Sequence, residues 1–252
     1  MRRAIVERRT SPQGFTLLAP PGAAPRGEAL GLAASHLRFT LSRLQANGSR
    51  ALSWGAKRGM DVVGSAAALL LLSPIFAVAA IIIKASDRGP VLHWQTRVGK
   101  GGRVFRFPKF RSMVVGAEAM TDSLVADNHH GDDGVTFKIP QDPRITRFGR
   151  ILRKTSIDEL PQFWCVLRGD MSLVGPRPPL PREVDRYTPA QRRRLDVIPG
   201  LTCIWQVSGR SDIPFERQVE MDLEYIETRT FFMDVKLLFM TIPAVINGRG
   251  AY

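Results

Sequence analysis

Two neighbouring carboxylates and an arginine between prolines are the residues of this chain best suited to chemistry. Asp158 and Glu159 lie in the segment 155–161, and Arg177 follows in a proline-rich run. Flanking prolines fix the backbone, and a fixed guanidinium offers a phosphate two parallel charged hydrogen bonds. A carboxylate nucleophile, a second carboxylate and a rigid arginine together indicate phosphoryl chemistry with a divalent metal ion.

The same carboxylates also fit a structural role. Ser156-x-x-Glu159 has the spacing of a capping box at a helix start, and Pro161 is tolerated in a first turn. A helix N-terminus also attracts anions and keeps a nearby carboxylate ionised, which favours the chemical role of Asp158.

Two longer motifs carry a family resemblance. The runs Asp-Glu-Leu-Pro-Gln at 158–162 and Arg-Gly-Asp-Met-Ser-Leu-Val-Gly-Pro-Arg-Pro at 168–178 closely resemble the monotopic polyprenyl-phosphate phosphoglycosyl transferases, the bacterial sugar transferase family. The resemblance covers residues 57–252. Larger members carry several transmembrane helices ahead of this region, so the chain resembles a short form.

The resemblance implies a reaction. A sugar 1-phosphate passes from a UDP-sugar to polyprenyl (undecaprenyl) phosphate, UMP leaves, and an aspartyl-phosphosugar intermediate forms on Asp158. This is the first membrane step of exopolysaccharide, capsule, O-antigen or glycoconjugate assembly. Asp158 and Glu159 are expected to bind Mg²⁺; whether Glu159 instead handles the acceptor's proton stays open.

Further motifs predict the residues that bind phosphate. Strands are expected at 91–98 and 103–115, joined by the glycine-rich turn 99–102, with alternate residues from Phe105 to Met113 on one face. The run 109–113 resembles the family's Lys-Phe-Arg-Ser/Thr-Met motif, although charge on a solvated edge strand would give the same pattern. We expect phosphate contacts from Lys109, Arg111, Arg153 and Arg177.

A third motif concerns the nucleotide. Residues 199–210 resemble the family's Pro-Gly-Leu-Thr-Gly-x-Trp-Gln-Val-Ser-Gly-Arg, with Cys203 in place of a glycine, and Cys165 stands where the family usually has Asn. Nucleotide contacts are expected from Trp205, Gln206 and Arg210. A packed turn around a buried Trp205 is the alternative.

Composition limits the class of partner. The 252 residues carry a net charge of +13, which requires an anionic partner: nucleic acid, anionic lipid or phosphate substrates. Two cysteines do not make a disulfide framework. No groove-reading or base-stacking motif is recognised, which disfavours nucleic acid. A membrane-anchored scaffold without enzymatic activity would explain the charge but gives Asp158 and Arg177 no role.

The uncharged run 62–83 predicts a membrane segment. It is just long enough to cross a hydrocarbon core, but Ser73-Pro74 interrupts it and cations lie on both flanks. These features favour a re-entrant helix at 57–84 that returns to the cytoplasmic side, as in the resembled family. A spanning helix is the stronger alternative and a buried core helix the weaker.

The rest of the chain completes the predicted organisation. Residues 1–56 are expected to form a basic, partly disordered tail, and residues 85–252 the cytoplasmic catalytic part. Within the tail, residues 30–44 fit either an interfacial amphipathic helix or a mobile linker. The polar run 127–134 is expected to be a loop and not a metal site. We expect a basic amphipathic helix at 142–154, a basic helix at 188–197 and a helix with charges of both signs at 215–230. The strongly apolar segment 231–246 is expected to be a helix that either lies on the membrane surface or packs in the fold.

These elements predict an α+β monotopic membrane protein with a helix broken at Ser73-Pro74, a small antiparallel sheet and several interfacial helices. We expect it at the cytoplasmic face of the bacterial inner membrane. The expected partners are a UDP-sugar, polyprenyl phosphate, anionic phospholipid, downstream glycosyltransferases and a second copy as a homodimer, but no nucleic acid.

Overall fold

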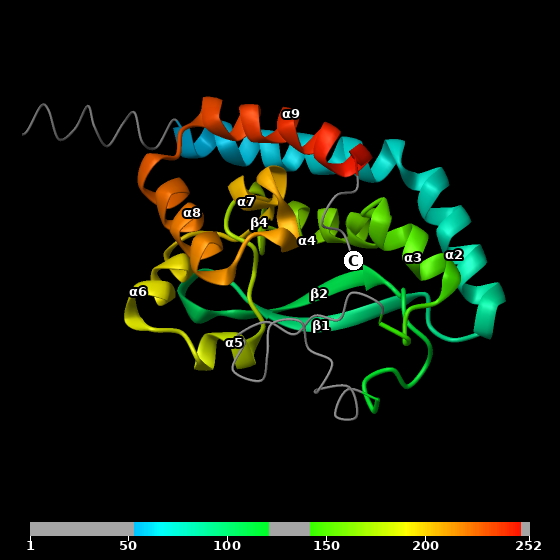
Figure 1. The fold of residues 1–252 in the computed structure, drawn as a ribbon. Helices are drawn as coiled ribbons and strands as arrows, with labels where there is room; N and C mark the ends of the chain where they lie inside the picture. Colours follow the sequence, from blue (N-terminus) through cyan, green and yellow to red (C-terminus); the bar gives the residue numbers. More distant parts are fainter. Residues whose placement is uncertain (1–52, 121–141, 248–252) are drawn as a thin grey trace, which may run out of the picture. The chain divides into compact units, whose positions relative to one another are not determined.

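A computed structural model describes residues 53–120 and 142–247 (Figure 1). The chain divides into two units, Met1–Arg50 and Ala51–Tyr252, and the described residues all belong to the second. Residues 1–52 of the expected tail, including its expected helix at 30–44, and the expected loop at 127–134 lie outside the described residues, whereas residues 53–56 are already helical.

A bent pair of helices opens the described chain. The helix Ser53–Leu71 and helix α2 (Ser73–Asp87) meet at Leu72 with a bend of 56°. Pro74 has no N–H to donate to the carbonyl four residues earlier, and the Ser73 hydroxyl donates to that Leu70 oxygen instead, at 2.8 Å. The break therefore falls where the sequence predicts it. Within the described ranges no single helix is long and apolar enough to cross a membrane, whereas this bent pair together is.

An antiparallel hairpin forms the larger sheet. Strand β1 (Leu92–Val98) pairs with β2 (Val104–Phe110) through the 3₁₀ turn η1 (Lys100–Gly102), and His93 lies opposite Lys109. The expected second strand, 103–115, is too long. Beyond Phe110 the chain leaves β1, and the Ser112 carbonyl accepts a hydrogen bond from the Thr146 N–H at 3.1 Å. Arg111 and Met113 therefore do not continue the strand.

A second, parallel pair of strands was not predicted. Strand β3 (Ser172–Val174) pairs with β4 (Gly200–Thr202), and these strands precede and follow the proline-rich run. The main core lies between this pair and the hairpin, and includes Phe107, Val166 and Tyr225.

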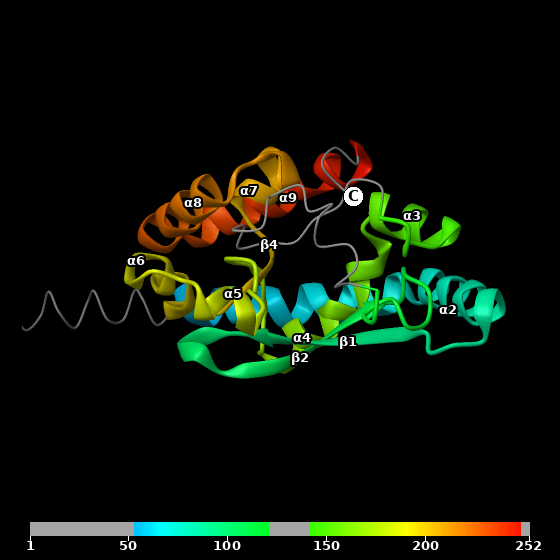
Figure 2. The ribbon, with the colours of Figure 1, turned by 60° about the horizontal axis from the view of Figure 1, so that its bottom comes forward.

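Helices cover one side of the hairpin, which lies along the lower edge of the molecule in Figure 2, and the helices and strands together confirm the α+β class (Figures 1 and 2). The expected helix at 142–154 is shorter, because α3 begins only at Arg147, where the Thr146 hydroxyl caps it. The remaining helices and 3₁₀ turns are η3 (Ile157–Gln162), α4 (Phe163–Arg168), α5 (Pro181–Asp185), α6 (Pro189–Arg192), η4 (Arg193–Asp196), α7 (Ile204–Ser208), η5 (Arg210–Asp212), α8 (Phe215–Thr228) and α9 (Phe231–Asn247).

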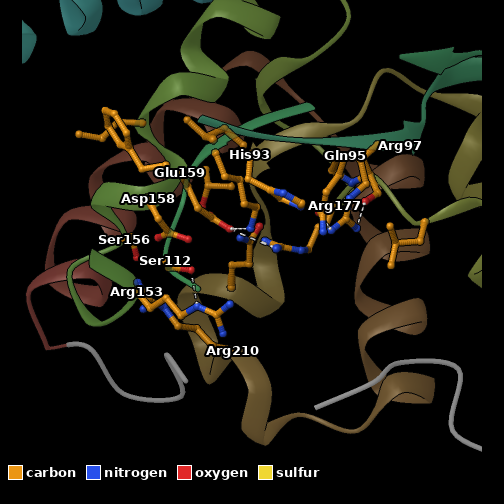
Figure 3. A pocket seen from close by; sticks show the side chains of 18 of the residues that line it. His93, Gln95, Arg97, Ser112, Arg153, Ser156, Asp158, Glu159, Arg177 and Arg210 are labelled. Carbon is orange, nitrogen blue, oxygen red and sulfur yellow. Dashed lines mark hydrogen bonds and ion pairs between the residues drawn. The ribbon is translucent and has the colours of Figure 1, made fainter. Parts of the chain in front are cut away.

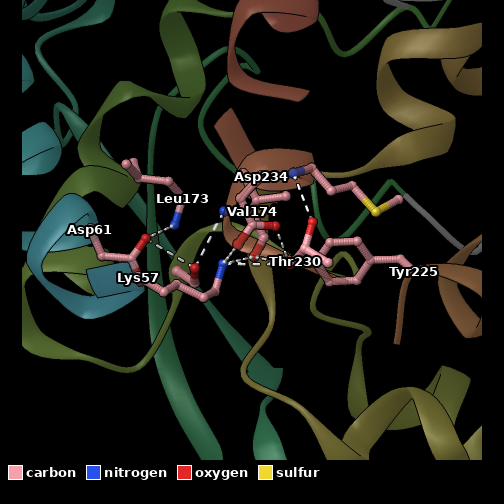
Figure 4. A network of polar contacts seen from close by, with 9 residues as sticks. Lys57, Asp61, Leu173, Val174, Tyr225, Thr230 and Asp234 are labelled. Atoms are coloured by element: carbon pink, nitrogen blue, oxygen red, sulfur yellow. Dashed lines mark hydrogen bonds and ion pairs between the residues drawn. The ribbon is translucent and has the colours of Figure 1, made fainter. Parts of the chain in front are cut away.

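Charged side chains attach the first helix to the rest of the fold (Figure 4). Lys57 Nζ donates to Asp234 Oδ2 at 2.5 Å and to the Val174 carbonyl at 3.0 Å. Asp61 Oδ1 accepts from the Leu173 N–H at 2.9 Å and from the Ser172 hydroxyl at 3.0 Å. The helix is therefore fixed to β3 and α9 by hydrogen bonds to charged groups, which are among the stronger kind.

Candidate active site

One cavity brings the predicted site residues together. It has a volume of about 1500 Å³ and lies beside β1, β2, η3 and the proline-rich run (Figure 3). Its lining includes every residue that the sequence assigns to catalysis, phosphate or nucleotide: Lys109, Arg111, Arg153, Asp158, Glu159, Arg177, Trp205, Gln206 and Arg210. Residues spread over a hundred positions of sequence thus share one site.

The alternative of a capping box at Ser156 is not found in the structure. Ser156 has φ 56° and ψ 17°, in the left-handed region, and its side chain makes no capping hydrogen bond. A capping residue instead needs an extended backbone to turn its hydroxyl onto the following N–H groups. The chain turns at Ser156 from α3 into η3, whose first turn holds Asp158 and Glu159.

Glu159 joins the two predicted cations of the site. Its Oε1 accepts from Lys109 Nζ at 2.9 Å and from Arg177 Nη2 at 3.1 Å. Burial alone would raise the pKa of Glu159, but Lys109 and Arg177 outweigh it and lower the pKa well below the ordinary range. Glu159 therefore stays ionised and fixes both cations beside Asp158.

Asp158 has a different environment. Its side chain is buried, at 6% exposure, and no side chain or backbone group in the described parts of the chain donates a hydrogen bond to its carboxylate. Burial raises the pKa of Asp158 to about 6, with Lys109 opposing the rise and Glu159 adding to it. A carboxylate that is ionised at neutral pH, poorly hydrated and without hydrogen bonds is suited to nucleophilic attack.

The run that carries Arg177 is held through its carbonyls, because proline has no N–H to donate. The Pro176 carbonyl accepts from Gly200 N at 2.9 Å and the Pro179 carbonyl accepts from Val98 N at 2.9 Å. The Pro178 carbonyl accepts from Arg97 Nη1 at 3.1 Å. The rigid presentation of Arg177 therefore depends on groups far away in sequence.

Arg97 is a site residue that the sequence reasoning missed. It is 8% exposed and lies over the Phe107 ring, and its Nη2 donates to Gln95 Oε1 at 2.9 Å. His93, Gln95 and Arg97 alternate along β1, and all three line the cavity. The period of two in β1 was the signal that could have found them.

The other predicted site residues line the cavity, but their hydrogen bonds and ion pairs are with groups other than Asp158 and Glu159. Arg153 Nε donates to Ser112 Oγ at 2.9 Å, and Arg111 forms an ion pair with Asp87. Arg210 lines the cavity with a left-handed backbone, φ 54°. Trp205 is 6% exposed and also lines the cavity, which is compatible with both the packed turn and a nucleotide contact.

Comparison with known proteins decides the family. A family model described as "Bacterial sugar transferase" matches residues 52–248. The chain belongs to this family.

The similar proteins have names that refer to sugar transfer or to exopolysaccharide production. This sugar transferase is 46% identical over 197 residues to "Galactosyl transferase CpsE" of Streptococcus agalactiae, covering 78% of this chain and 43% of the relative. It is 40% identical to "Exopolysaccharide production protein ExoY" of Rhizobium meliloti, and the match covers 78% of this chain and 88% of the relative. It is also 40% identical to "Undecaprenyl-phosphate galactose phosphotransferase" of Salmonella typhimurium, and the match covers 84% of this chain and 45% of the relative. The chain thus spans less than half of two of these relatives.

Both departures from the family motifs are accommodated as packed thiols. Cys165 is buried, and its Sγ donates to the Arg106 carbonyl at 3.5 Å; burial raises its pKa to about 11. Cys203 is buried as well, and its Sγ donates to Gln206 Oε1 at 3.1 Å. Burial also raises the pKa of Cys203 well above its ordinary value. Neither thiol is suited to nucleophilic chemistry.

Replacing Arg177 with lysine tests the guanidinium. We expect Arg177→Lys to lower kcat/KM for the sugar donor about tenfold to a hundredfold, because lysine keeps the charge but loses the planar two-bond grip. The matched control is Arg193→Lys, since Arg193 forms an exposed ion pair with Glu227 at 3.0 Å and does not line the cavity. An Arg177→Lys enzyme as active as that control would make Arg177 purely structural.

Proposed function

We propose that this sugar transferase moves a sugar 1-phosphate from a UDP-sugar to undecaprenyl phosphate and releases UMP. The proposal rests mainly on the buried Asp158 carboxylate, which accepts no hydrogen bond from any residue that the structure describes and lies beside a Glu159 that holds Lys109 and Arg177. The names of relatives support the acceptor and the general reaction; one, from Caulobacter vibrioides, is "UDP-glucose:undecaprenyl-phosphate glucose-1-phosphate transferase".

The proposed reaction has two steps at one aspartate. An Asp158 oxygen attacks the β-phosphorus of the UDP-sugar, the bond from that phosphorus to the UMP oxygen breaks, and UMP leaves. An oxygen of the lipid phosphate then attacks the same phosphorus and releases Asp158. Lys109, Arg177, Arg153 and Arg210 offset the phosphate charges during both steps, as cations do in other phosphoryl transfers.

Mg²⁺ fits the carboxylate pair. Mg²⁺ usually takes one or two carboxylates, with waters and substrate phosphates as its other ligands. Within residues 53–120 and 142–247 there is no group of three or more His, Cys, Asp or Glu placed to hold a metal. Asp158 and Glu159, which line the cavity side by side in sequence, are the residues that we propose would hold it. When bound, the ion would lessen repulsion between the donor phosphates and the carboxylate.

We also propose that the bent helix pair enters the membrane from the cytoplasmic side and returns to it. Large apolar side chains are exposed on both helices, including Val63, Leu70, Leu71 and Ile81, and on α9, including Phe232, Phe239 and Ile246. A lipid surface would cover these side chains and bring the site to a lipid-borne acceptor. The proposed location is the inner membrane of a bacterium.

The decisive experiment measures UMP release by the purified full-length chain. A panel of UDP-sugars is incubated with Mg²⁺, with and without undecaprenyl phosphate, and the lipid product is isolated. We expect UMP and a sugar-diphospholipid from at least one donor. Binding of acidic membranes without UMP release from any donor would support the scaffold interpretation instead.

Replacing Pro74 tests the re-entrant topology. Pro74→Ala restores the missing donor to Leu70 and removes the ring, so the helix should straighten and a fraction of molecules should carry the tail across the membrane. Labelling single cysteines introduced near residues 1 and 252 in intact cells reports this; both ends should be protected in the parent chain. Periplasmic labelling of the parent's tail alone would refute the hairpin.

A further inference from the structure

The backbone of Ser156 is unusual for a serine. It follows Thr155, the residue that ends α3, and has φ 56° and ψ 17°. Its N–H donates to the Arg153 carbonyl at 3.0 Å and its carbonyl accepts from Glu159 N at 3.2 Å. Glycine is the usual residue at this place after a helix, because a Cβ is crowded in the left-handed region. A serine at this position should make the folded protein less stable than a glycine would.

The hydroxyl does not compensate for this strain within the described chain. It makes no capping bond to η3 and no hydrogen bond to any described residue. Neighbouring hydroxyls differ: Thr155 Oγ1 donates to the Ile151 carbonyl at 2.8 Å, and Ser112 Oγ accepts from Arg153. Strained residues persist at functional sites where the group they present is used.

The position of Ser156 indicates which ligand its hydroxyl could bind. Ser156 lines the cavity together with Asp158, two residues further on. Figure 3 shows the two side chains on the same side of the site as Ser112 and Arg153, away from Arg97 and Gln95. A hydroxyl at this place can donate one hydrogen bond to an anion that reaches Asp158.

We propose that the Ser156 hydroxyl donates a hydrogen bond to a non-bridging oxygen of the phosphoryl group that Asp158 takes up. The proposal rests on the proposed function. As the Asp158–phosphorus bond forms and the bond to the UMP oxygen breaks, charge is spread over the non-bridging oxygens, and a fixed donor stabilises it. Ser156 keeps its proton and forms no covalent bond. It is thus a further catalytic residue, outside the two carboxylates.

The test separates the hydroxyl from the backbone. Ser156→Gly removes both hydroxyl and strain, so its melting temperature should rise by about 2 °C or more. Its kcat for UMP release should fall about tenfold or more, with KM for the donor little changed, because the bond strengthens in the transition state. Ser156→Ala keeps the strain and should lose kcat to the same extent without the rise in melting temperature.

Arg88→Gly is the matched control. Arg88 has φ 57° and ψ 6° at the end of α2 and does not line the cavity. Its replacement should raise the melting temperature and leave kcat unchanged. A Ser156→Gly enzyme with full kcat would overturn the proposal, and so would parallel losses of kcat and melting temperature in both Ser156 variants. If the parent chain released no UMP from any UDP-sugar, the proposed function itself would fall first.

Discussion

Asp158→Asn should abolish sugar phosphate transfer, with a loss of turnover of at least about ten-thousandfold, as when a nucleophile is removed from other enzymes. Asparagine keeps the shape of the side chain but cannot attack phosphorus. The measurement is single-turnover labelling: a UDP-sugar labelled in its sugar, without acceptor, should leave label on the peptide containing Asp158 in the parent chain and none in the variant.

Two comparisons make this result decisive. Glu159→Gln should still form some adduct if Glu159 acts mainly with the acceptor. Double-reciprocal plots should be parallel, since UMP leaves before the lipid phosphate reacts. Intersecting lines together with no adduct in the parent chain would refute the covalent mechanism and leave a direct transfer between two bound substrates.

Protonation of Asp158 should set the acid limb of the pH profile. Burial raises its pKa to about 6, so the rate of adduct formation should fall about tenfold per pH unit below that value. A raised carboxylate pKa means that the fold favours the protonated form, so this group's contribution to stability is lost as pH rises through about 6. Asp158→Asn should therefore melt no lower than the parent above pH 6. A rate that is flat from pH 7 to pH 5 would contradict this assignment.

Gly200→Ala should strongly destabilise the fold. A Cβ at Gly200 would lie 2.0 Å from Gly175 N and 2.5 Å from the Gly175 carbonyl oxygen, both backbone atoms that cannot move alone. Gly200 N also donates a hydrogen bond to the Pro176 carbonyl. Pushing the segment around Gly200 away from the segment around Gly175 would therefore displace Arg177. We expect a loss of roughly 3 kcal/mol of stability, or failure to fold.

The control for Gly200 is Gly59→Ala. A Cβ at Gly59, in the helix Ser53–Leu71, meets no atom within 4 Å, and alanine is the better helix former. Thermal unfolding of both variants in the same detergent checks the prediction. A Gly200→Ala protein with the melting temperature of the parent chain would show that the segments around Gly175 and Gly200 separate easily.

The sequence was informative where a pattern is local. Glycines at 99, 101 and 102 predicted the hairpin turn, and Ser73-Pro74 predicted the break, because each acts on its own backbone. Strands β3 and β4 are three residues long, too short to show a period. The hydrogen bond from Arg97 to Pro178 spans 81 positions, and no local pattern reports it. At Ser156 the capping spacing was present, but the turn between α3 and η3 set a backbone that prevents the cap.

The attachment of the first helix also orders the assembly of the protein. Lys57 and Asp234 lie 177 positions apart, a gap that takes roughly 10–35 s to synthesise at ordinary rates of translation. Until α9 emerges, Lys57 lacks the carboxylate that neutralises it, although every motif of the cavity up to Arg210 has been made. A chain interrupted before Asp234 would keep the hydrogen bonds between Asp61 and β3 but would leave the partly buried ammonium of Lys57 without its carboxylate. Lys57 near the start of the described chain therefore acquires its carboxylate partner only after the motifs of the cavity up to Arg210 have been synthesised.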